Sequence, residues 1–118
     1  MGTFRVEIQI GDPQGDRWEA VEALVDTGAS HTVLPRPLLE RLGVRPLRRV
    51  PFRLADERQV GYDVGQTQVR LDGQTLFTIV VFGDARMEPL LGAVTLEEFH
   101  LGVDPVGRRL IPVPGLLM

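Results

Sequence analysis

The sequence predicts an all-β fold with one or two short helices, in which an antiparallel sheet folds over on itself or forms a closed barrel. Short apolar segments that alternate with polar residues recur along the 118 residues, and 13 Gly and 9 Pro separate them. Helical spacing of apolar residues is confined to two short stretches. The length suits one hydrophobic core, so we expect residues 1–118 to form a single domain.

The first third of the chain predicts a hairpin, a short strand and a helix. Residues 4–10 alternate apolar and polar side chains, which is typical of a half-buried strand. The turn-forming residues 12–15 connect it to a second strand at about 17–25. A short apolar strand at 32–34 precedes a helix in which Leu38, Leu39 and Leu42 share one face, and which ends at Gly43.

The middle of the chain predicts two more hairpins. Strands at 50–54 and 60–64 flank the polar segment 55–59, which we expect to be an exposed tip. Asp72-Gly73 is a strong signal for a tight hairpin after a strand at 69–71. The following segment, 76–82, is apolar almost throughout and is expected to be a central strand.

The last part of the chain predicts a second helix and an edge strand. Thr95-Leu96-Glu97-Glu98 matches a capping box, in which Thr95 caps the first turn of a helix that runs to about His100. A turn at 104–107 leads to a strand at 110–111. Pro112 and Pro114 cannot donate to a neighbouring strand, so this strand is expected at an edge.

Composition excludes several classes of partner. The net charge is −3 without a large basic surface, so we expect no binding to nucleic acid or to a membrane surface. Cysteine is absent, and the N-terminus does not resemble a signal peptide, so the expected location is cytoplasmic. His31 and His100 lack the spacing of metal ligands, and we expect no metal and no cofactor.

The sharpest feature is a carboxylate that directly follows an apolar strand. Residues 23–25 lead into Asp26, Thr27 and Gly28, so we expect the carboxyl group to lie in a partly buried position. Gly28 allows the backbone to turn so that N–H groups point at the carboxylate, and Thr27 can bond to a partner strand. Hydrolysis by such a group needs two carboxylates that share one proton. The chain has one Asp-Thr-Gly, so the second carboxylate must come from another copy.

Residues 24–34 resemble the catalytic loop of retropepsin-like aspartic proteases, and cellular prokaryotic members more than viral ones. Residues 89–92 resemble the family's hydrophobic-hydrophobic-Gly segment, which packs beneath that loop and precedes a helix. Residues 55–59 lie where the family has its flap. The resemblance implies an acid-protease fold and an aspartic endopeptidase that cleaves peptide or protein substrates as a homodimer.

The resemblance also implies a role for each site residue. Asp26 would be catalytic, and the loop would be supported by Thr27, Gly28, Leu91 and Gly92. Substrate contacts would come from Ala29, Ser30, Ala55, Asp56, Glu57 and Arg58. One alternative is a catalytically silent member of the fold that binds peptides or mediates dimerisation. Another is an unrelated small barrel with a chance motif, which predicts a monomer.

Overall fold

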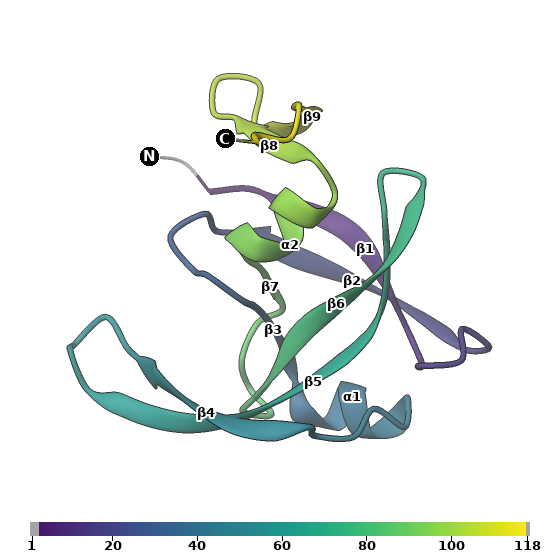
Figure 1. The fold of residues 1–118 in the computed structure, drawn as a ribbon, viewed down its shortest axis with the longest axis vertical. Helices are drawn as coiled ribbons and strands as arrows, with labels where there is room; N and C mark the ends of the chain where they lie inside the picture. Colours follow the sequence, from purple (N-terminus) through teal and green to yellow (C-terminus); the bar gives the residue numbers. More distant parts are fainter. Residues whose placement is uncertain (1–2, 118) are drawn as a thin grey trace.

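The computed structural model describes residues 3–117, which form nine strands and two short helices (Figure 1). The strands are β1 (Arg5–Gly11), β2 (Trp18–Val25), β3 (Thr32–Pro35), β4 (Arg48–Arg53), β5 (Gln59–Leu71), β6 (Gln74–Gly83), β7 (Leu90–Leu91), β8 (Leu101–Asp104) and β9 (Arg109–Pro112). The helices are α1 (Arg36–Arg41) and α2 (Ala93–Glu98). The prediction of an all-β fold with two short helices is confirmed.

Seven of these strands form one sheet in the order β1-β2-β7-β3-β6-β5-β4, and β1 also pairs with β5. The sheet therefore folds back on itself, whereas its closure into a barrel stays a prediction. Most strand pairs are antiparallel as expected, but β2 pairs with β7 and β3 pairs with β6 in parallel. The chain reaches these parallel partners through long crossovers, which sequence alternation does not reveal.

The core lies inside the folded sheet and explains the alternating pattern. Ile8 and Ile10 of β1 are buried, while their neighbours Arg5 and Glu7 are exposed. Helix α1 covers part of the core with Leu38 and Leu39, and the chain leaves it through Gly43 at a φ of 72°. Side chains from all these elements pack into one cluster, which gives the strands near the site a rigid base.

Strand β5 is longer than predicted. The segments 60–64 and 69–71, which the sequence presents as separate, are parts of one strand of 13 residues. Its first half pairs with β4, and its second half pairs with β6 and β1. The turn at Asp72-Gly73 was predicted correctly, and both residues have the positive φ that a tight hairpin requires.

The predicted capping box at α2 was wrong. The helix begins at Ala93 after Gly92, and Thr95 lies inside it with no role as a cap. Glu98 accepts a hydrogen bond from the Thr78 hydroxyl at 2.6 Å and does not reach back to the helix start. The helix also ends at Glu98, before His100, which has a φ of 55°.

The C-terminal residues form a separate small hairpin. Strands β8 and β9 pair only with each other, above α2 and near the N-terminal strand in Figure 1. Pro112 is the last residue of β9, so the predicted edge position of this strand is confirmed. None of the helices within residues 3–117 has the length and apolar character needed to cross a membrane.

Candidate active site

Asp26 follows the last residue of β2 and is fixed there by β7. Val25 is buried and pairs with Leu91 across the parallel β2–β7 contact. The Asp26 amide donates to the Leu91 carbonyl at 3.1 Å, and the Ala29 amide donates to the Asp26 carbonyl at 3.2 Å. The apolar strand thus delivers the aspartate into a tight turn whose backbone is anchored on both sides.

The Asp26 carboxylate is held in a defined orientation. The Gly28 amide donates to its Oδ1 at 2.9 Å. A Cβ at position 28 would lie 3.1 Å from the same oxygen, so a larger residue would crowd this contact. Asp26 is half-buried, and within the described part of the chain its Oδ2 has no hydrogen-bond partner. One oxygen is therefore oriented by the loop, and the other is not engaged by the described residues.

The loop that follows Asp26 rests on residues 91–94. The Ala93 amide donates to the Ala29 carbonyl at 2.8 Å, and the Val94 amide donates to the Ser30 carbonyl at 2.9 Å. A Cβ on Gly92 would overlap the carbonyl group of His31 and lie 3.0 Å from its Cα. The structure thus brings Leu91 and Gly92 directly behind the loop. Thr27, which the sequence singles out for support, has an exposed side chain.

A buried chain of hydroxyl groups connects this support to the core, and sequence analysis missed it. Thr32 Oγ1 accepts from the Gly92 amide at 3.1 Å and lies 2.7 Å from Thr95 Oγ1. Thr95 Oγ1 lies 2.9 Å from Thr78 Oγ1, which donates to Glu98. All three threonines are buried. Because they come from β3, β6 and α2, only the folded chain brings them together.

Removal of the central hydroxyl is expected to destabilise the fold. Thr95→Val keeps the side-chain shape but leaves the Thr32 and Thr78 hydroxyls each without one partner. We expect the free energy of unfolding to fall by about 2 kcal/mol, which urea denaturation would measure. Thr75→Val, at an exposed position of β6, is the matched control and should change it by less than about 0.5 kcal/mol. Equal losses of unfolding free energy in both variants would show that the buried threonine hydroxyls do not stabilise the fold.

An apolar pocket of about 290 Å³ lies between the Asp26 loop and the β4–β5 hairpin. Its lining comprises Gly28, Ala29, Ser30, His31, Val33, Phe52, Arg53, Leu54, Tyr62, Val81 and Met87. Ala29 and Ser30 were singled out by the sequence, and the structure brings them to this pocket. The hairpin contributes the end of β4, which the sequence did not single out.

The other four predicted contact residues, 55–58, lie outside the pocket lining and form the exposed tip of the hairpin. The tip is closed by the Leu54 amide, which donates to the Arg58 carbonyl at 2.8 Å. Arg58 also forms an ion pair with Asp56 at 2.6 Å, and Glu57 has a φ of 73°. In this conformation residues 55–58 do not touch the site.

Three aromatic rings build the wall of the pocket beside the loop. His31 meets Phe52 edge-on, with 5.2 Å between ring centroids, and Phe52 lies 6.2 Å from Tyr62. The Ser30 hydroxyl and His31 Nδ1 are 2.8 Å apart, which fixes the orientation of the imidazole. These contacts join the loop to the hairpin, so the pocket shape depends on both.

A second hollow, of about 380 Å³, is lined by Asp26 itself, which does not line the first pocket, and the two hollows share Gly28. Its lining comprises Thr3, Phe4, Val25, Asp26, Thr27, Gly28, Val103 and Pro105. Within residues 3–117, neither of the two hollows that flank the loop contains a carboxylate other than that of Asp26. One described chain therefore supplies a single acid to this region.

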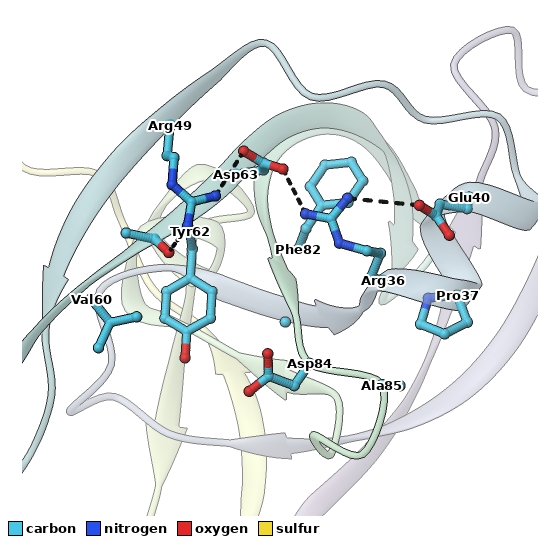
Figure 2. Close-up of a pocket in the computed structure, with 12 residues that line it drawn as sticks. Arg36, Pro37, Glu40, Arg49, Val60, Tyr62, Asp63, Phe82, Asp84 and Ala85 are labelled. Atoms are coloured by element: carbon cyan, nitrogen blue, oxygen red, sulfur yellow. Dashed lines mark hydrogen bonds and ion pairs between the residues drawn. The ribbon is translucent and has the colours of Figure 1, made fainter.

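A third pocket, of about 430 Å³, lies at the base of the hairpin and is polar. Figure 2 shows Arg49, Asp63, Arg36 and Glu40 joined in a row by ionic contacts. Arg36 donates to Asp63 at 2.6 Å and, with a smaller contribution from Arg49, lowers the pKa of that carboxyl group. These charges neutralise one another and brace β5 against α1.

Comparison with known proteins identifies the family. The model of the family described as "gag-polyprotein putative aspartyl protease" matches residues 17–98, which include Asp26, the β4–β5 hairpin and Gly92. The chain belongs to this family. The resemblance to retropepsin-like aspartic proteases, seen first in the residues around Asp26, is thereby confirmed. No curated protein sequence matches the chain.

Solved structures of retropepsin-like proteases share the fold. The solution structure of simian foamy virus protease is 20% identical, with a TM-score of 0.58, over 81% of this chain and 94% of that one. The retroviral protease-like domain of Ddi1 from Leishmania major is 19% identical, with a TM-score of 0.56, over 92% and 87%. A retropepsin-like aspartic protease from Rickettsia conorii is 20% identical, with a TM-score of 0.54, over 87% and 88%. At these identities the similarity establishes a retropepsin-like fold.

Proposed function

We propose that two copies of this chain form an aspartic endopeptidase in which each contributes Asp26 to a catalytic dyad. The observation that carries the proposal is the half-buried Asp26 carboxylate, oriented by the Gly28 amide beside an apolar pocket. Within residues 3–117, the hollows flanking Asp26 supply no second carboxylate. A two-fold axis beside Asp26 would bring the two loops together and complete the pair.

The dyad would activate water by sharing one proton. Two carboxyl groups at close range cannot both ionise, so one is a base while the other stays protonated. The base takes a proton from the attacking water, and the acid donates its proton to the carbonyl oxygen of the scissile peptide bond. The Gly28 amide, which bonds Oδ1, would keep each carboxylate aligned with its partner.

The other predicted residues would have supporting roles in this assembly. The exposed Thr27 hydroxyl would bond across the dimer axis, while Gly28 and Ala29 form the floor beside the scissile bond. Leu91 and Gly92 would hold the loop from behind. Ser30 would contact an extended peptide, and residues 55–58 would reach it when the hairpin closes. The substrate class is therefore peptides and proteins.

The extent and setting of the protein are proposed on the sequence alone. Residues 1–118 would form one domain whose sheet closes into a barrel, and the protein would act in the cytoplasm. The proposed mechanism uses water and two carboxyl groups, so it needs neither a metal nor a cofactor.

Dilution tests the shared site directly. Below the dissociation constant of the dimer, the dimer concentration varies with the square of the chain concentration. We therefore expect specific activity on a mixed peptide library to fall about tenfold for each tenfold dilution of the chain. Analytical ultracentrifugation at the same concentrations should show dimers disappearing in parallel.

Two outcomes would overturn the proposal. Specific activity that stays constant while the chain sediments as a monomer would contradict a site shared between copies. Peptide binding without cleavage at any pH or concentration would instead identify the chain as a catalytically silent binding module. Activity that falls on both sides of a pH optimum is expected of a dyad that shares one proton.

A further inference from the structure

Arg53 is the one side chain of fixed charge in the lining of the pocket beside Asp26, within the described chain. The rest of that lining is mainly apolar or aromatic, with Val33, Phe52 and Met87 among its members. No acidic side chain of residues 3–117 contributes to it. An occupant of this pocket therefore meets an apolar wall and one positive charge.

Arg53, like Arg48 of the same strand, forms no ion pair within residues 3–117, and of these two arginines only Arg53 lines the pocket. Arg49 lies opposite Asp63 in the β4–β5 register and forms an ion pair with it, and Arg58 pairs with Asp56. Arg53 lies opposite Gln59, which carries no charge. Within residues 3–117, no carboxylate or hydrogen-bond acceptor contacts the Arg53 guanidinium.

We propose that Arg53 is a specificity-determining residue that selects peptides carrying an acidic side chain next to an apolar one. This inference rests on the proposed endopeptidase function and names its substrate class. The apolar side chain would lie against Val33 and Phe52, and the acidic one would accept from the Arg53 guanidinium. A guanidinium donates two parallel hydrogen bonds to a carboxylate, which makes this contact stronger than a neutral one.

Peptides that differ in one charge would test the proposal. A fluorogenic peptide with an apolar core carries Glu, Gln or Lys at each position in turn, and kcat/KM is measured for each. For wild type we expect the best Glu peptide to exceed its Lys counterpart by about threefold to tenfold, and the difference to shrink as salt rises. Arg53→Gln should remove the preference, and Arg53→Glu should reverse it.

Arg48→Gln is the matched control, because Arg48 is an exposed residue of the same strand that lines none of the pockets described above. It should keep the wild-type preference. Equal rates for Glu and Lys peptides in wild type would overturn the proposal, as would a preference that survives in Arg53→Gln.

Binding separates this inference from the endopeptidase function itself. Fluorescence anisotropy of the same peptides is measured with the Asp26→Asn chain, which leaves them intact. An Arg53-dependent preference in binding supports the inference even if wild type cleaves nothing, in which case only the endopeptidase function fails. Cleavage that depends on Asp26 but not on peptide charge would support the endopeptidase function and overturn the inference about Arg53.

Discussion

Asp26→Asn is expected to lower kcat/KM for peptide cleavage by about 10³-fold or more. Asparagine keeps the size of the side chain, and its amide oxygen can still accept from the Gly28 amide. It cannot exchange a proton, so neither the base nor the acid of a dyad can form. The rates of both purified chains on the same peptide library would measure the effect.

Asp16→Asn removes an equal charge from an exposed turn and is the matched control. It should retain full activity, and both variants should unfold at nearly the wild-type temperature. Mixing adds a sharper test: with nine parts of Asp26→Asn and one part of wild type, random pairing leaves about 1% of dimers with two aspartates. An Asp26→Asn chain that cleaves at the wild-type rate would contradict the proposed chemistry.

The position of Asp26 could be predicted because the information is local. Residues 23–25 are apolar and residues 26–28 are small or polar, so the strand had to end where the carboxylate begins. The hairpin at Asp72-Gly73 was predictable for the same reason, since two adjacent residues specify the turn. Leu91 and Gly92 were found behind the loop, where the family resemblance placed them.

Features that depend on tertiary contacts could not be predicted. Thr95 and Glu98 have the spacing of a capping box, but the Ala93 and Val94 amides bond to the loop and start the helix earlier. Thr95 then enters the core, where its hydroxyl meets two others. Alternation likewise predicted a strand near Phe52, but the register and curvature of the hairpin decide that this end of β4 lines the pocket.

Gly92→Ala is expected to cause the largest loss of stability among the substitutions considered. Gly92 has a φ of −96° and a ψ of 173°, which alanine adopts without strain, so the cost comes from packing alone. The added methyl group would overlap the His31 carbonyl, and backbone on both sides of the contact is held by hydrogen bonds. We expect the free energy of unfolding to fall by about 3 kcal/mol or more, as measured by urea denaturation.

Gly73→Asn is the control for replacing a glycine, because a Cβ there meets nothing within 4 Å and asparagine tolerates the positive φ. It should change stability by less than about 1 kcal/mol. The remaining folded fraction of Gly92→Ala should also cleave peptides more slowly. Displacement of His31 moves the loop that begins at Asp26, and a shift of about 1 Å in a catalytic group lowers rates greatly. Wild-type stability and activity in Gly92→Ala would show that the loop accommodates the added methyl group without loss of stability. Gly92 would then have no role in positioning Asp26.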